Sequence, residues 1–257
     1  MRSFISVTLA VAGRNLKTAL RNPSLLFPPL IAPLIFFAVF AGGLGTLGRA
    51  PGFDFPAGYT SFSWVFMSFQ AAAFNGVFAG FSLAQDYERG FTPRLMLAAP
   101  RRGALISGYA LSALARTALS LVILFVAGVL AGMRLEGSAL EIAGIFVLAL
   151  AFGVVASLWG VGVAFRTRTI QAAPGMQIPI FLAMFFAPAF VPLALLTGWI
   201  HGVATYNPVT YLLEAGRGFI AGHPTDVVRA WTIVAVLLPL LTLWARLGLR
   251  RAERSAA

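Results

Sequence analysis

The chain has 257 residues, of which 59 % are hydrophobic and only 11 % are charged, whereas roughly a quarter of the residues in a typical globular chain are charged. This composition excludes an ordinary soluble domain, and the absence of cysteine excludes disulfides and thiolate sites. The net charge of +11 would suggest nucleic-acid binding in a soluble protein, but in a membrane protein it orients the chain, because basic residues collect on the cytoplasmic side.

Residues 1–22 predict an amphipathic helix that lies in the membrane interface, rather than a cleavable signal peptide, because they lack an unbroken apolar core. A simple basic anchor before the first span is the alternative interpretation. Apolar and polar positions separate onto two faces of the helix. The apolar face has Ile5, Leu9, Ala12, Leu16 and Leu20, and the polar face has Ser3, Ser6, Arg14, Lys17 and Arg21.

Six apolar runs follow, and each is long enough to cross a bilayer as a helix, which takes about 20 residues. They predict an all-α integral membrane protein with one transmembrane domain over residues 1–257. The predicted spans cover residues 25–44, 59–84, 107–132, 141–165, 175–197 and 227–247.

The basic residues predict that both termini are cytoplasmic. With the N-terminus inside, fourteen Lys and Arg residues fall in inner segments and four in outer segments, which is the asymmetry that the positive-inside rule describes. Residues 85–106 are then cytoplasmic, and residues 198–226 are extracellular.

A stripe of polar residues runs along the second predicted span. Ser61, Ser68, Asn75 and Ser82 recur every seven residues and therefore share one face of a helix. Polar groups in lipid are costly, so this stripe must face other helices or a cavity. We favour hydrogen bonding between helices, and contact with a cargo is the alternative.

Residues 85–106, QDYERGFTPRLMLAAPRRGALI, contain charged stretches on both sides of an apolar stretch. A simple connection between two spans would need neither. We call them the coupling segment. Gly90 breaks the inward extension of the second span. Thr92 is predicted to cap a short helix, and Pro93 to occupy its first position.

From Pro93 the short helix is predicted to continue over residues 94–99 and to end before Pro100, because the residue before proline avoids the α region. Leu95, Met96 and Leu97 would form an apolar knob on it. Such a knob must enter either the lipid interface or a groove on another protein, and composition alone leaves both open.

Single residues and small-residue patterns mark the other spans. Arg116 lies inside the third span, where it either reaches back to the cytoplasmic surface or forms a buried ion pair. Prolines are expected to kink the first and fifth spans. The fourth span carries small residues that permit close helix packing, namely Gly153, Ser157, Gly160 and Ala164.

The sequence lacks the motifs of an enzyme or an ATP-binding protein. The only lysine, Lys17, lies in no glycine-rich loop, so a P-loop is absent. There is no Ser-His-Asp set, and two histidines are too few for a histidine-rich metal site. The acidic residues lie in the segments between spans or at the ends of spans, so a proton relay within the membrane is not expected either. Any uphill transport would therefore draw energy from a partner, and we expect no cofactor or metal in this chain.

Three stretches together resemble ABC-2 type transporter permeases, over nearly the whole chain. The coupling segment is similar to the coupling-helix region of that family, and Arg14–Pro23 to its entry into the first span. Asn207–Gly222, NPVTYLLEAGRGFIAG, resembles its NP-x-x-Y motif before the last span. The pattern is most similar to permeases of the daunorubicin-resistance type, which export drugs or small lipids.

The resemblance implies a permease of the bacterial inner membrane that pairs with a second permease, usually a copy of itself. Two separate ATPase subunits, which bind ATP and Mg²⁺, would dock below it, and transport would proceed by alternating access. The resemblance assigns contact with the ATPase to part of the coupling segment. These residues are Glu88, Gly90, Arg94, Leu95, Met96, Leu97, Pro100 and Arg101.

The resemblance also implies short re-entrant helices near an outer gate, within residues 198–226. Asn207 would cap such a helix, Pro208 would begin it, and Gly222 would end it. Tyr211 belongs to the motif. Glu214 and Arg217 are spaced to form an ion pair on the helix.

The cargo path is predicted at the dimer interface, between the first, second and fifth spans. Twenty-three phenylalanines would suit an apolar, amphipathic cargo, although most of them are expected to face lipid or to pack. The residues predicted to line the path are Phe36, Phe40, Phe69, Asn75, Met184 and Phe185.

Two other functions remain as alternatives. One is export of a polysaccharide or glycolipid, which aromatic stacking along the path would favour. The five tryptophans lie mostly near span ends, as in an interfacial belt, and this favours a drug or lipid. The other is a membrane enzyme or assembly factor, which would need clustered catalytic groups that the sequence does not show.

Overall fold

The computed structural model describes residues 2–49, 51–98 and 102–254, and every regular element in those ranges is a helix. The prediction of an all-α protein is confirmed. The elements are α1 (Arg2–Arg21), α2 (Pro23–Gly43), η1 (Gly45–Arg49), α3 (Gly58–Glu88), α4 (Phe91–Ala98), α5 (Gly103–Leu130), α6 (Ala139–Thr167), η2 (Ile170–Ala172), α7 (Ala173–Phe185), η3 (Leu193–Leu195), α8 (Gly198–Tyr206), α9 (Pro208–Ile220) and α10 (Val227–Arg254).

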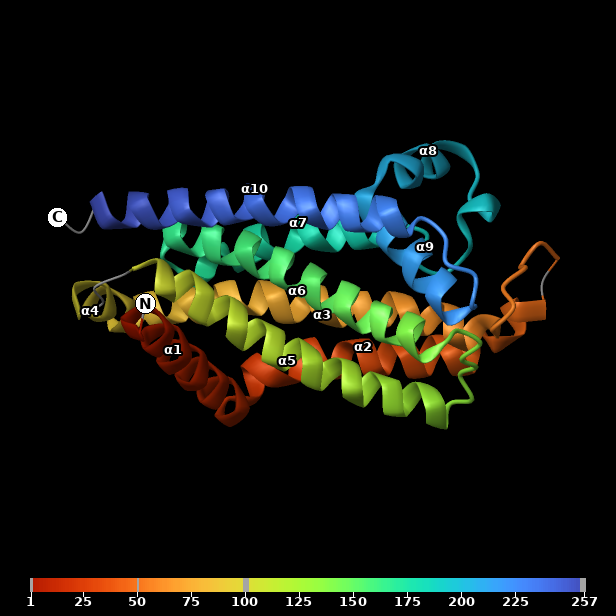
Figure 1. Cartoon of the computed structure of the whole chain (residues 1–257), viewed down its shortest axis with the longest axis horizontal. Helices are drawn as coiled ribbons and strands as arrows, with labels where there is room; N and C mark the ends of the chain where they lie inside the picture. Colours follow the sequence, from red (N-terminus) through yellow and green to blue (C-terminus); the bar gives the residue numbers. More distant parts are fainter. Residues whose placement is uncertain (1, 50, 99–101, 255–257) are drawn as a thin grey trace.

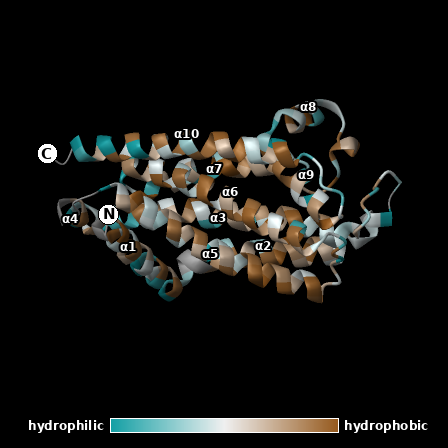
Figure 2. Ribbon diagram, viewed as in Figure 1, coloured by the Kyte–Doolittle hydropathy of each residue, from teal (hydrophilic) through white to brown (hydrophobic). Residues whose placement is uncertain are grey.

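The long helices run side by side along the longest axis of the molecule, and both termini lie at the same end (Figure 1). Four helices are long and apolar enough to cross a membrane, namely α3, α5, α6 and α10. Two shorter apolar stretches, Phe27–Gly43 and Ile170–Phe185, correspond to the first and fifth predicted spans. Hydrophobic residues line the long helices, and hydrophilic residues gather at the C-terminal end of α10 and on α1 (Figure 2).

The predicted fifth span, 175–197, is wrong in its second half. The helix α7 ends at Phe185, and only the short 3-10 helix η3 interrupts the irregular backbone that follows. Pro188 and Pro192 explain the difference, because proline lacks the N–H that a helix needs and restricts the residue before it. By contrast, α2 continues through Pro28, Pro29 and Pro33.

The central helix is α3, whose whole membrane-length window is buried inside the protein. It packs against α6 through glycines. A Cβ placed on Gly76 would lie 2.5 Å from the carbonyl oxygen of Gly153, and one on Gly80 would lie 2.5 Å from the carbonyl carbon of Gly160. The small-residue track predicted on the fourth span therefore serves close helix packing, as expected.

The polar stripe on α3 is buried and faces neighbouring helices. The hydroxyls of Ser61, Ser68 and Ser82 each donate to the carbonyl four residues earlier. The Asn75 side chain donates to Ser120 Oγ on α5 at 2.9 Å. The favoured interpretation, hydrogen bonding between helices, is confirmed at Asn75, whereas these three serine hydroxyls donate to carbonyls four residues earlier in the chain.

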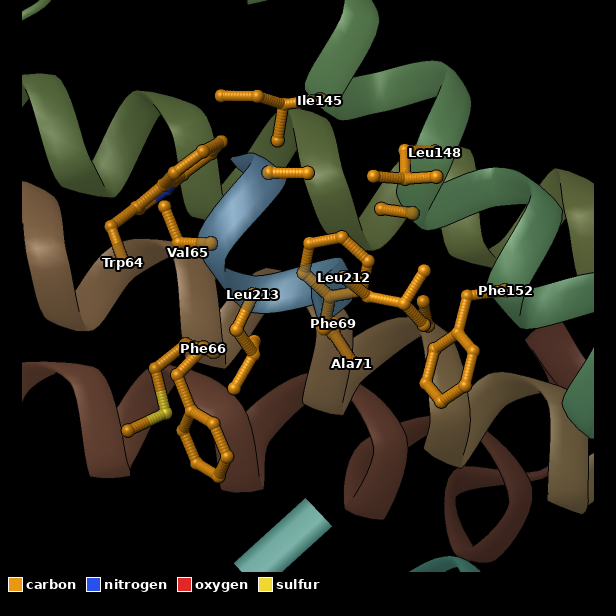
Figure 3. Packing of buried hydrophobic residues seen from close by; sticks show 14 of the residues in the cluster. Trp64, Val65, Phe66, Phe69, Ala71, Ile145, Leu148, Phe152, Leu212 and Leu213 are labelled. Carbon is orange, nitrogen blue, oxygen red and sulfur yellow. The ribbon is translucent and has the colours of Figure 1, made fainter. Parts of the chain in front are cut away.

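Aromatic and aliphatic side chains fill the space around one half of α3 (Figure 3). Leu212 and Leu213 of α9 lie among Val65 and Phe69 of α3 and Leu148 of α6. The short helix α9 is thus part of the core rather than a surface loop.

The tryptophans do not form one interfacial belt. Trp64 is 1 % exposed and donates to the carbonyl of Leu124 at 2.8 Å. Trp159 and Trp244 stack at 5.4 Å between ring centres, and the Arg166 guanidinium lies 3.5 Å from the Trp244 ring centre. These contacts hold α10 against α6.

The predicted amphipathic helix is confirmed as α1, which lies at an angle to the long helices (Figure 1). It packs against α5, where a Cβ on Gly108 would lie 2.7 Å from Val11. Ile5, Leu9 and Leu20 are at least half exposed. Its location in a membrane interface stays a prediction.

Candidate functional site

The coupling segment lies at the end of the molecule that carries both termini, where α4 forms a short helix between α3 and α5 (Figure 1). Gly90 turns the chain there with a φ of +69°, in the left-handed region that glycine adopts readily. The described residues of the segment thus form structured elements, as predicted. Ala99, Pro100 and Arg101 of the prediction lie outside the described residues, so the predicted end of the short helix before Pro100 stays a prediction.

The predicted start of the short helix is wrong by a few residues. The helix α4 begins at Phe91 rather than at Pro93, so Thr92 is a helical residue and does not cap it. Pro93 is the third residue of α4. Proline is tolerated there because the first four N–H groups of a helix have no partner within the helix.

The predicted apolar knob faces the interior at Met96 and in part at Leu95, and the side chain of Leu97 lies outside the described part of the chain. Met96 is 5 % exposed and lies in the core cluster, and its sulfur accepts a hydrogen bond from the Tyr87 hydroxyl at 3.3 Å. Leu95 is half-buried against the same cluster. Arg94 is exposed on the other side of the helix. The surface that α4 offers to another protein therefore includes Arg94 and excludes Met96.

Glu88, predicted to contact a partner, bonds within this chain. Its Oε1 accepts a hydrogen bond of 2.7 Å from the Thr169 hydroxyl and one of 2.8 Å from the backbone N–H of Ile170. These residues form the connection between α6 and α7. The end of α3 is thereby joined to that connection, directly before the coupling segment turns.

An ion pair that the sequence analysis missed joins α1 to α3. Arg14 pairs with the Asp86 carboxylate, which also accepts a hydrogen bond from the Tyr109 hydroxyl of α5. The Arg14 guanidinium lies 3.7 Å from the centre of the Phe91 ring, at the start of α4. The position of Asp86 near the end of the apolar second span was the sequence signal of this pair, because an unpaired buried carboxylate is costly.

The C-terminal helix joins the same region. Arg102 donates to the carbonyl of Met96 at 3.1 Å and pairs with Glu253 of α10 at 3.5 Å. Arg168 donates to the carbonyl of Ala252 at 3.3 Å. These contacts connect α4 with α1 and with the ends of α3, α5 and α10, so a displacement of α4 would act on all of these helices.

The residues predicted to line a cargo path do not share one surface. Phe40 packs on Phe190 at 4.2 Å between ring centres, and Phe185 lies 6.2 Å from the same ring. Phe69 instead packs on Phe152 of α6, and Asn75 faces α5. Met184 is fully buried, whereas Phe36 is 39 % exposed.

At the opposite end, α9 has the capped start that the sequence predicts. The Asn207 side chain accepts a hydrogen bond of 3.0 Å from the N–H of Val209, and Pro208 is the first residue of the helix. Gly222 follows the helix with a φ of +70°. The Tyr211 hydroxyl donates to the carbonyl of Thr205 at 2.8 Å.

The predicted pair of Glu214 and Arg217 forms, with 2.8 Å between its charged atoms. Arg217 is buried and also donates to the carbonyls of Pro188 and Ala189, at 2.7 and 3.2 Å. Its guanidinium lies 3.5 Å from the centre of the Phe62 ring. These contacts join α9 to α3 and to the irregular backbone after α7, which is a structural role.

Comparison with known proteins assigns a context to these features. The family model described as "ABC-2 type transporter" matches residues 6–220. The chain is 26 % identical over 224 residues to a probable doxorubicin resistance ABC transporter permease protein, DrrC, of Mycobacterium tuberculosis, covering 87 % of this chain and 80 % of the relative. It is 24 % identical over 221 residues to the daunorubicin resistance ABC transporter permease protein DrrB1 of Streptomyces coeruleorubidus, covering 85 % and 76 %.

Proposed function

Because this chain belongs to the ABC-2 type transporter family, we propose that it is the permease subunit of an ATP-driven exporter for an amphipathic drug-like molecule or small lipid. Permeases of this family work with ABC ATPase subunits, generally as dimers, and the chain is a multi-pass protein of the bacterial plasma membrane. The likeness to the permeases named for doxorubicin and daunorubicin resistance supports the choice of cargo class.

The position of α4 is the observation that carries the proposal. A short helix with an exposed arginine lies at the end of the molecule that carries both termini (Figure 1), and its inner face is fixed to α3 and α5 through Met96 and Arg102. Another protein that binds such a helix can displace it, and the helix can transmit the displacement to the spans. In the proposed complex, two ATPase subunits contact α4 of two permease copies.

The remaining arrangement follows from this assignment. Six crossings place both termini in the cytoplasm, α1 lies in the inner membrane interface, and α8 and α9 form a re-entrant pair on the outer side. Closure of the ATPase dimer on ATP displaces α4 in both copies. The spans then exchange inward for outward access to a site between the copies.

Co-expression of the chain with single ABC ATPases of the same organism tests the proposal. We expect one of them to co-purify and to hydrolyse ATP, and the complex in proteoliposomes to move doxorubicin or a fluorescent phospholipid only when ATP is supplied. A variant ATPase that binds ATP but does not hydrolyse it is the matched control. A complex that hydrolyses ATP but moves neither doxorubicin nor a fluorescent phospholipid would contradict the proposed cargo class.

A further inference from the structure

Arg116 is buried midway along the long helix α5, far from both ends of that helix. It lies thirteen residues after Gly103 (116 − 103), the first residue of α5, which corresponds to about 20 Å along an α-helix. Its residue exposure is 1 %. The predicted reach back to the cytoplasmic surface is therefore wrong.

The guanidinium of Arg116 is poorly compensated by its surroundings. Nη2 donates to the carbonyl of Asn75 at 3.3 Å. Nε and Nη1 have no hydrogen-bond partner among the described residues. None of the ion pairs in the described part of the chain includes Arg116, so the predicted buried pair is not formed either. A buried charge without a partner is costly.

No acidic residue of the chain can compensate Arg116 at this depth. All eight acids lie in connections, at helix ends or on α9, so a second copy of the chain in the same orientation brings none to the middle of the membrane. They are Asp54, Asp86, Glu88, Glu136, Glu141, Glu214, Asp226 and Glu253. A counter-charge for Arg116 must therefore come from another molecule.

Other buried polar side chains extend from Arg116 in both directions. Ser112, Arg116 and Ser120 are spaced by four residues on one face of α5, and none is more than 3 % exposed. Ser120 accepts a hydrogen bond from Asn75, and the Ser112 hydroxyl donates to Asn15 of α1 at 2.6 Å. We call Ser112, Arg116, Ser120 and Asn75 the polar strip.

We infer that the polar strip binds the acidic group of an amphipathic anion, a carboxylate or a phosphate, whose apolar part stays among the surrounding helices. Arginine matches both groups, because its planar set of N–H donors forms paired hydrogen bonds to two oxygens. The hydroxyl of Ser120 can donate a further hydrogen bond. This inference rests on the proposed function only in making the anion a cargo, and within the proposed cargo class it then favours an anionic lipid over an amine such as doxorubicin.

Thermal unfolding of the purified full chain in a neutral maltoside detergent tests the inference. The probes share one tail and differ in charge: dodecanoate, dodecyl phosphate, dodecanol and dodecylamine, each below its micellar concentration. A ligand that binds the folded state raises the Tm. We expect at least one of the two anions to raise the Tm, and the alcohol and the amine not to do so. The two anionic probes distinguish a carboxylate from a phosphate site.

Variants of Arg116 separate binding from a structural role. Arg116→Met should weaken the response to the anion by roughly tenfold or more, because it removes charge-assisted hydrogen bonds. Its Tm without the anion should not fall, because the variant also removes an uncompensated charge. Arg134→Gln removes an exposed arginine and should leave the response unchanged.

Three results would overturn the inference: no anion raises the Tm of the natural chain, an anion raises it equally in Arg116→Met, or that variant is less stable without the anion. If Arg116→Met cannot be purified, Arg116→Lys keeps the charge but loses the paired donors, and its response must be several-fold weaker. This assay contains no ATPase and no transport step. A complex that fails to transport would therefore contradict the proposed function and leave anion binding intact.

Discussion

The Arg14 guanidinium lies 3.7 Å from the centre of the Phe91 ring and pairs with Asp86. This relationship joins the first residue of α4 to the N-terminal helix and to the end of α3. The side chain of Asp86 is 6 % exposed and that of Arg14 is 32 % exposed, so the carboxylate is the member that depends most on its partners.

We expect Asp86→Asn to lower the free energy of unfolding by about 1–3 kcal/mol, because both Arg14 and Tyr109 lose a charged acceptor. Thermal unfolding in detergent measures this, at roughly 2–4 °C per kcal/mol for a chain of this size. Glu253→Gln is the matched control, because its pair with Arg102 is longer and more exposed and should contribute at most about 1 kcal/mol. Equal losses in the two variants would contradict the prediction.

Charge reversal at Arg94 should separate binding of the ATPase from folding. Arg94→Glu alters an exposed side chain, and its free energy of unfolding should change by no more than about 0.5 kcal/mol. Co-purification of the ATPase should fall. Arg250→Glu, an exposed position at the end of α10, controls for net charge and should keep the ATPase bound.

Met96→Asp should instead prevent correct folding, because it places a carboxylate at a 5 % exposed position in the core. Size-exclusion chromatography of the solubilised chain would show aggregation or loss. A monodisperse Met96→Asp protein that has lost only the ATPase would mean that Met96 faces the partner after all.

The contact between α3 and α6 depends on the absence of a side chain at Gly76. Gly76→Ala should lower the free energy of unfolding by about 1–3 kcal/mol, because the new Cβ would lie 2.5 Å from the carbonyl oxygen of Gly153. Gly13→Ala in α1 is the matched control. No atom lies within 4 Å of its Cβ position, and alanine should stabilise that helix by up to about 1 kcal/mol. Thermal unfolding of both variants should give shifts of opposite sign.

Arg217 should be the most costly arginine to replace at the end of the molecule opposite the termini. Arg217→Met removes an ion pair and two hydrogen bonds to carbonyls in a buried site, and we expect a loss of about 3–5 kcal/mol. Arg229→Gln breaks a pair in which the arginine is 69 % exposed and should cost less than about 1 kcal/mol. A lower Tm for Arg217→Met than for Arg229→Gln would show that burial sets the cost, and the Tm of Arg217→Lys should lie between these two values.

The long helices could be predicted from the sequence because apolar runs of membrane length leave few alternatives. The start of α9 was also predictable, since Asn207 and Pro208 act on their own neighbours. The early end of α7 was missed because residues 186–197 are as apolar as a span. The prolines within them were interpreted as kinks rather than as an end.

Contacts between distant parts of the chain were beyond the sequence analysis. Glu88 and Thr169 are 81 residues apart, and Arg14 and Asp86 are 72 residues apart. A charged side chain shows that a partner is needed, but only the packing of helices decides which partner it has. For the same reason, the sequence did not distinguish the inward side of Met96 from the outward side of Arg94.

The irregular backbone after α7 also couples the evolution of two positions, Pro188 and Arg217. Pro188 and Ala189 lie beyond the end of a helix, so their carbonyls receive no helical hydrogen bond, and Arg217 supplies it from 29 and 28 residues away. In a relative whose α7 continues past this point, these two carbonyls would accept hydrogen bonds within the helix. A buried arginine at the position of Arg217 would then lose both of these acceptors. Replacement of Pro188 and replacement of Arg217 should therefore occur together among relatives. A chain that replaces only Pro188 should be destabilised by the arginine that it keeps.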